Sequence, residues 1–226
     1  MPRVDLAPAA GEVARLQNGV RDDQLSDPTP CQDTPVAALL DHLMGLSLAF
    51  TWAARKTGPP AGVPSPPPGL ARAETLDPDW RAHLPRRLTE LVEAWREPAA
   101  WEGMTEAGGV QLPAEVMGVV ALDELVLHGW DLARATGQTF HCDPASTSAV
   151  LAFTRESAQP ERAASREGLF GPVVAVPADS SELDRALGFA GRDPAWTPPH
   201  TQDAPNLRVR GVHDVLRHHT GGGGGI

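Results

Sequence analysis

Cysteine and basic residues are both scarce in this chain. Its 226 residues include only 2 cysteines, Cys31 and Cys142, whose spacing fits neither a zinc-binding motif nor a disulfide framework. Lysine and arginine together number 19, against 29 aspartates and glutamates, so the net charge is -10. Because a protein whose main partner is a nucleic-acid backbone needs a basic stripe, this balance argues against that class of partner.

Long apolar runs are also missing. The longest, such as residues 117–122, are far short of the ~20 residues that a membrane-spanning helix needs. Residues 1–5 carry charge with no apolar core behind it, so they do not make a secretory signal. The sequence has no phosphate-binding loop, nucleophile-elbow motif or dinucleotide fingerprint. We therefore expect a cytoplasmic protein that binds neither a membrane nor nucleic acid.

Apolar residues recur at spacings of three and four in the first part of the chain, which predicts helices. One helix is expected over about residues 6–20 and a second over 36–50. For the second, Asp33 or Thr34 is the expected N-cap and Pro35 the first helical residue.

Two further long helices follow. Residues 80–95 form an apolar seam, in which Pro85 is expected to kink the first turn or delay the start. The longest helix covers roughly 114–136, is apolar almost all the way round and ends at Gly137. The remaining predicted elements are a β-compatible piece within 101–112, helices at 146–157 and 182–190, and a loop over 160–177 with a short strand at 173–176.

These elements favour an all-α fold, a four-helix bundle, because long alternating strands and internal repeats are missing. Residues 58–78 are rich in proline and form a long irregular crossover. We divide the chain into a metal-binding bundle over 1–158 and a small, mostly irregular C-terminal extension over 159–197. Residues 198–226, which end in glycines, are expected to be a flexible tail that can be removed.

Three ionisable residues interrupt one face of the longest predicted helix. Glu124, His128 and Asp131 share a stripe with apolar residues at helical spacing. A buried lone carboxylate is costly, so it must be paired, protonated or bound to a metal ion. Asp131 could orient the ring of His128, or it could instead cap the helix or pair with Arg134.

The second predicted helix offers a third ligand. His42 lies on an apolar face with small residues around it, which leaves room near the imidazole. Three protein ligands with one open position are the arrangement of catalytic zinc, and helix bundles build such sites from facing helices. On spacing alone, the alternatives are a Glu124–His128 hydrogen bond without metal and a core histidine at position 42.

Several segments resemble the actinobacterial metal-binding branch of the DinB-like superfamily. They are residues 27–33, 39–45 and 124–138, with 170–172, 176–179 and 187–194 in the C-terminal part. That branch is similar to the N-terminal domain of mycothiol-dependent maleylpyruvate isomerase. The resemblance covers about residues 10–197 and implies a divalent metal ion on His42, Glu124 and His128. Thr34 departs from the pattern, because related sequences usually carry Trp there.

The other candidates have ordinary explanations. Cys31 precedes a predicted helix, where a thiol can be activated, but a packed small residue is the simpler interpretation, and we expect it to be dispensable for activity. Cys142 has no assigned role. Trp130 is expected in the core or in a pocket wall. The histidines of the tail, such as His213, lie in a glycine-ended segment that makes a functional metal site there an unfavoured interpretation.

An open ligand position on zinc can hold a water for hydrolysis or a thiol that becomes a thiolate. The resemblance favours the thiol, and it implies mycothiol as co-substrate and a small-molecule electrophile as second substrate. The leading hypothesis is a metal-dependent mycothiol S-transferase in detoxification or secondary metabolism. The alternatives are a mycothiol-dependent cis–trans isomerase and a non-catalytic metal-binding protein. A His2Glu site also accepts other divalent metals, and the sequence leaves a homodimer open.

Overall fold

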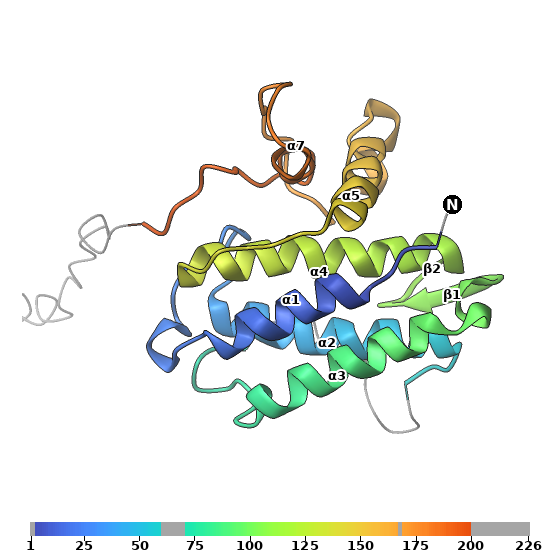
Figure 1. Ribbon diagram of the computed structural model, residues 1–226, viewed down its shortest axis with the longest axis horizontal. Helices are drawn as coiled ribbons and strands as arrows, with labels where there is room; N and C mark the ends of the chain where they lie inside the picture. Colours follow the sequence, from blue (N-terminus) through green and yellow to red (C-terminus); the bar gives the residue numbers. More distant parts are fainter. Residues whose placement is uncertain (1–2, 60–70, 167–168, 200–226) are drawn as a thin grey trace, which may run out of the picture.

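The computed structural model of the chain describes residues 3–59, 71–166 and 169–199. Its centre is a four-helix bundle of α1 (Ala7–Asn18), α2 (Val36–Arg55), α3 (Trp80–Arg96) and α4 (Ala114–Thr136), shown in Figure 1. In the bundle α1 and α2 each contact both α3 and α4. The predicted all-α fold is therefore confirmed. Most of the predicted crossover and most of the tail lie outside the described residues.

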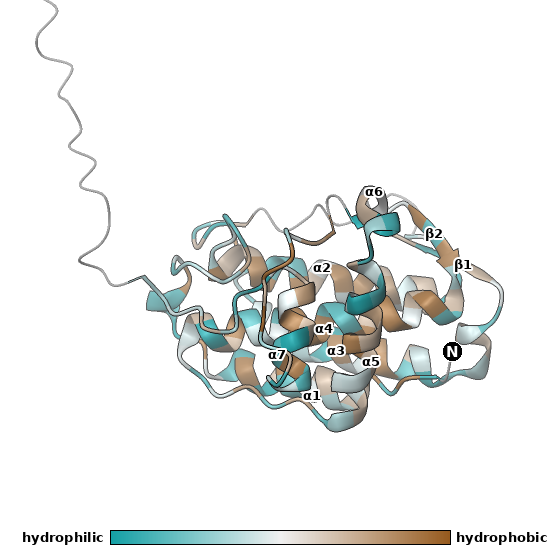
Figure 2. Ribbon diagram, turned by 90° about the horizontal axis from the view of Figure 1, so that it is seen from above, coloured by the Kyte–Doolittle hydropathy of each residue, from teal (hydrophilic) through white to brown (hydrophobic). Residues whose placement is uncertain are grey.

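A second layer of helices covers the outer side of α4. It consists of α5 (Pro144–Ser157) and α7 (Glu182–Phe189), which pack on each other, while α5 also contacts α4 and the short α6 (Ala163–Arg166). Figure 2 shows this layer lying across α4. Because α4 has the bundle on one side and α5 on the other, it is buried almost all round, as its apolar sequence predicts.

A small hairpin joins α3 to α4. Strands β1 (Met104–Ala107) and β2 (Val110–Pro113) pair antiparallel, with Met104 opposite Pro113 and Ala107 opposite Val110. The hydroxyl of Thr105 donates to the Ala53 carbonyl at 2.5 Å, which holds the hairpin against the end of α2. This is the β-compatible piece expected within 101–112. The described residues at 173–176 form no strand, so that prediction was wrong.

The start of α2 differs from the sequence prediction. Pro35 is the N-cap in extended conformation, and neither Asp33 nor Thr34 caps the helix through its side chain. The first free N–H groups instead donate to the incoming loop, Val36 to the Asp27 carbonyl and Ala37 to the Leu25 carbonyl. Since backbone carbonyls satisfy the orphan donors, no side-chain cap is needed there.

The other helix ends largely follow the predictions. α3 begins at Trp80 and runs through Pro85, so of the two effects expected of this proline, a kink or a delayed start, the delayed start was wrong. α4 ends at Gly137, whose φ of 69° is the left-handed conformation that favours glycine. α5 begins two residues earlier than predicted, because Asp143 accepts the N–H groups of Ala145 and Ser146 and Pro144 takes the first turn.

One helix of the described residues, Val36–Arg55, is long and apolar enough to cross a membrane by length and composition. Its apolar window is 67% buried within the protein. Burial of this kind is what the core helix of a bundle shows, and α2 packs against both α3 and α4.

Candidate metal centre

His42 on α2 and Glu124 and His128 on α4 meet at the contact between these two helices. One ligand atom from each lies within 4.8 Å of the other two. The Glu124 Oε2 atom is 3.1 Å from His128 Nε2 and 3.4 Å from His42 Nε2. The two imidazole rings pack edge to face with their centroids 4.8 Å apart. The structure thus brings together the three residues that the sequence predicted as ligands.

The charges of the cluster are strongly coupled. Burial alone would lower the pKa of His128, but hydrogen bonds to Asp131 and Glu124 outweigh it and raise the pKa to about 10. Burial would raise the pKa of Glu124, yet hydrogen bonds from His128 and then His42 hold it well below its ordinary value. Without a metal ion, the centre therefore holds an ionised carboxylate and an imidazolium at neutral pH.

Asp131 fixes the ring of His128 from the other side. Its Oδ2 atom lies 3.1 Å from His128 Nδ1, so Nε2 is the nitrogen left for a metal ion. Asp131 is fully buried, and burial would raise its pKa, but the charge of Arg192 and the hydrogen bond with His128 lower it. Of the two roles weighed for Asp131, the structure shows contact with His128, while Arg134 donates to the Trp196 carbonyl instead.

Arg192 is the residue of this network that the sequence reasoning missed. It follows α7, is 8% exposed, and donates from Nη2 to Asp131 Oδ2 at 3.0 Å and from Nη1 to the Ala190 carbonyl at 3.2 Å. The network therefore runs from the C-terminal layer through Asp131 and His128 to Glu124 and His42. In the sequence, Arg192 stands 61 positions after Asp131. The only sequence signal for its role was its position within residues 187–194, one of the segments that carry the family resemblance.

Cys31 forms a second group with His128 and Asp131. One atom from each of the three lies within 4.8 Å of the other two. Asp131 already accepts two hydrogen bonds from the Arg192 guanidinium, at 3.0 and 3.4 Å. A cation at this position would displace or repel that charge, so the group is a poor metal site.

Asp123 is a further buried carboxyl of α4. It is 2% exposed, and its Oδ1 atom has no hydrogen-bond partner among the described residues. Burial raises its pKa well above the ordinary value, and the neighbouring charge of Glu124 adds to this effect. The pKa of Asp123 is therefore shifted in the opposite direction to that of Glu124 beside it.

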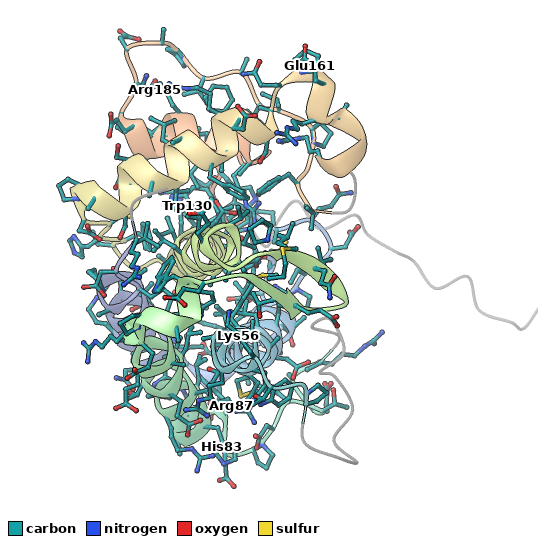
Figure 3. All side chains as sticks on the ribbon, turned by 90° about the vertical axis from the view of Figure 1, so that its right-hand side faces the viewer. Lys56, His83, Arg87, Trp130, Glu161 and Arg185 are labelled. Atoms are coloured by element: carbon teal, nitrogen blue, oxygen red, sulfur yellow. The ribbon has the colours of Figure 1, made fainter. Side chains whose placement is uncertain are left out.

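The other candidate residues lie apart from the centre. Trp130 is 5% exposed on the side of α4 that faces α5 (Figure 3), and the Arg134 guanidinium lies 5.8 Å from its ring, so it is a core residue. Cys142 is half-buried after α4, and burial raises the pKa of its thiol. The histidines of the tail lie outside the described residues. A cavity of about 460 Å³ lies at the other end of α2, beside Ala54 and Glu93.

The residues at the centre fit a divalent metal ion. Two imidazole nitrogens and an ionised carboxylate oxygen converge from two rigid helices, and one imidazole already has the carboxylate partner typical of metal-bound histidines. Imidazole nitrogens and carboxylate oxygens are among the ligands that zinc accepts.

Comparison with known proteins agrees with this architecture. The family model for the mycothiol maleylpyruvate isomerase N-terminal domain matches residues 6–133. Two uncharacterized proteins of Mycobacterium tuberculosis, from strains H37Rv and CDC 1551, are each 28% identical over 180 residues, which is 79% of this chain and 91% of theirs.

Solved structures show the same fold. Crystal structures of the mycothiol-dependent maleylpyruvate isomerase and of a mutant of it align with TM-scores of 0.55 and 0.50. Each alignment covers 85% of this chain and 79% of the other, at 16% and 14% identity. The family model spans more than half of the sequence, from the start of α1 almost to the end of α4. This chain therefore belongs to the mycothiol maleylpyruvate isomerase N-terminal domain family.

Proposed function

We propose that the protein is a divalent-metal enzyme that uses mycothiol as a nucleophile toward a small electrophilic molecule. The observation that carries the proposal is the convergence of His42, Glu124 and His128 within 4.8 Å, in a chain of this family. A metal ion bound there would supply positive charge that favours the deprotonated form of a thiol at its open position. Zinc is the ion that the donor set favours.

The protein's own residues prepare this centre. Asp131 holds Nδ1 of His128, so that Nε2 faces Glu124 and the ring cannot turn away. Arg192 neutralises the buried Asp131, which keeps this carboxylate from needing a proton of its own. His42 and Glu124 are 33% and 27% exposed at the side chain, so the centre is open to a small thiol from solvent.

The reaction begins with attack of the thiol sulfur on an electrophilic carbon, and two outcomes are possible. If the new carbon–sulfur bond persists, the protein is an S-transferase, which was the leading hypothesis from the sequence. If the sulfur leaves again after rotation about the former double bond, it is a cis–trans isomerase. The similarity to maleylpyruvate isomerase supports the second outcome.

The test compares thiol binding with turnover. We expect N-acetylcysteine, as a simple stand-in for mycothiol, to bind the zinc-loaded protein at pH 7 with release of a proton. In the cobalt-substituted protein, binding should add a charge-transfer absorption. A thioether product identifies a transferase, and an isomer of unchanged mass identifies an isomerase.

Two results would contradict the proposal. Hydrolysis of activated esters without any thiol, lost in Glu124→Gln and His128→Ala, would show a metallohydrolase. Neither thiol binding nor hydrolysis by the metal-loaded protein would favour a non-catalytic metal-binding protein.

A further inference from the structure

Gly191 follows the end of α7 and turns the chain back toward α4. Its N–H donates to the Gly188 carbonyl at 3.1 Å. The Arg192 N–H donates to the Leu187 carbonyl at 2.9 Å, which completes the motif that closes a helix around a left-handed residue. The φ of Gly191 is 83°, in the region that favours glycine. Arg192 is the first residue after this turn, and its side chain reaches Asp131 on α4.

The backbone of Gly171 crosses this turn at contact distance. A Cβ atom on Gly191 would lie 2.7–2.8 Å from the backbone atoms of Gly171, which is closer than real Cβ atoms come to other atoms. Backbone atoms have no other rotamer to adopt, so the chain itself would have to move. Two separate requirements therefore call for glycine at position 191, the left-handed conformation and the close approach of two backbones.

Arg166 binds the two crossing segments together. Its Nη2 atom donates to the Gly171 carbonyl at 2.7 Å and also to the Phe189 carbonyl in the last turn of α7. The Arg192 guanidinium donates to the next carbonyl, that of Ala190, at 3.2 Å. Two cations thus meet the C-terminal end of α7, where the helix dipole favours positive charge. Of these two, Arg192 also joins the carboxylate network of the metal centre.

We propose that Gly191 and Arg166 are positioning residues of the metal centre. They fix the end of α7 so that the Arg192 guanidinium meets Asp131, and through that carboxylate they hold the ring of His128. The proposal rests on the proposed function, because that function requires a metal ion at the centre. The bundle supplies the ligands, and the C-terminal extension fixes the orientation of one of them.

The experiment measures the zinc affinity of full-length Gly191→Ala and Gly109→Ala by chelator competition. Gly109 is the matched control, because its φ of 82° strains an alanine to the same extent, while a Cβ there meets no atom within 4 Å. We expect Gly191→Ala to bind zinc about 10-fold or more weakly than the wild type, because the ring of His128 is no longer held. Gly109→Ala should bind zinc as the wild type does.

Arg166→Met tests the same positioning without a backbone clash, and it decides the question alone if Gly191→Ala does not fold. It removes the hydrogen bonds to the Gly171 and Phe189 carbonyls, so zinc binding should weaken several-fold. Arg155→Met is its control, because the Arg155 guanidinium lies 5.9 Å from the ring of Phe189 but donates to no carbonyl at the end of α7 among the described residues. Arg155→Met should keep the wild-type affinity.

Two further measurements separate positioning from a general loss of stability. The double variant Gly191→Ala with Arg192→Gln should bind zinc as weakly as Arg192→Gln alone, because both changes act through one contact. In the metal-free protein, NMR should show that the Nδ1–H of His128 exchanges with water several-fold faster in Gly191→Ala and Arg166→Met than in the two controls.

Affinity losses that multiply in the double variant overturn the proposal, as does wild-type zinc affinity in both Gly191→Ala and Arg166→Met. A wild type that binds no zinc contradicts the proposed function instead. In that case the exchange of the His128 ring N–H in the metal-free variants decides by itself whether Gly191 and Arg166 position the ring.

Discussion

α4 carries two buried carboxyl groups, Asp123 and Asp131, and a half-buried one, Glu124, and Asp123 is held very differently from the other two. Glu124 and Asp131 each lie within 3.1 Å of a ring nitrogen of His128, and Asp131 also contacts Arg192. Asp123 is adjacent to Glu124 in the sequence, yet its buried Oδ1 atom has no partner among the described residues. The pKa values of Glu124 and Asp131 are lowered, while that of Asp123 is raised. Hydrogen-bond and ionic partners, not burial alone, decide the direction in which the pKa of each carboxyl group moves.

The largest effect, loss of the metal ion, is expected when the charge of Glu124 is removed. We expect the wild type to hold one divalent ion per chain and Glu124→Gln, like His42→Ala and His128→Ala, to lose it, because the carboxylate supplies the only ligand charge. Metal content after dialysis against a mild chelator measures this.

His83→Ala is the control for the ligand variants. Nδ1 of His83 also lies 2.6 Å from a carboxylate, that of Asp77, but His83 is far from the centre, on α3 (Figure 3). The His83→Ala variant should keep its metal ion. If both His42→Ala and His128→Ala keep wild-type metal content, the centre is misassigned.

The second largest effect is expected from the partners of His128. Asp131→Asn and Arg192→Gln should each weaken metal binding by about 10- to 100-fold, because the ring of His128 is no longer held. Each should also destabilise the protein by roughly 3–5 kcal/mol, since one buried charge loses its partner. Chelator competition and chemical unfolding give the two numbers.

Arg134→Gln separates this network from general contacts of the C-terminal segment. Arg134 binds the Trp196 carbonyl but no carboxylate of the centre. The Arg134→Gln variant should therefore leave the metal affinity unchanged. The Asp131→Asn and Arg192→Gln double variant should lose less stability than the sum of the single ones, and full additivity would show that the pair is not coupled.

These residues also show how far the sequence could predict the centre. Helical periodicity places Glu124 and His128 on one face, and the apolar face around His42, together with the family resemblance, adds a third ligand from the facing helix. No spacing rule could pair Asp131 with Arg192, because the contact depends on how α7 packs across α4. The same limit applies to the start of α2, where tertiary contacts with the Asp27 and Leu25 carbonyls replaced the predicted side-chain cap.

The pH dependence tests the charge on His128. In the metal-free protein its pKa is raised from 6.5 to about 10. The stability that its proton contributes is therefore fully present below about pH 6.5 and lost as the pH rises through about 10. A metal ion must displace this proton, so apparent metal affinity should rise with pH over this range, by up to about tenfold per pH unit.

Calorimetry in buffers of different ionisation enthalpy measures directly how many protons are released when the metal ion binds. About one proton should be released for each ion bound at pH 7.5. Release of none would mean that His128 is already neutral, and that its hydrogen bonds with Glu124 and Asp131 do not hold it protonated.

The smallest effect on stability is expected from replacing Asp123, and its sign is opposite to the one expected for Asp131. Its folded-state pKa is raised, so the folded protein binds more protons than the unfolded chain above the ordinary carboxyl pKa of 3.8. Stability is therefore lost as the pH rises from that value toward the raised pKa. Asp123→Asn removes this cost and keeps the shape, so it should be neutral or stabilising by up to about 1–2 kcal/mol at pH 8.

Unfolding midpoints of Asp123→Asn and Asp131→Asn, measured from pH 5 to 8, should move in opposite directions relative to the wild type. A loss of stability in Asp123→Asn comparable to that in Asp131→Asn would mean that Asp123 is ionised and has a partner, and would remove the contrast between the carboxyl groups of α4.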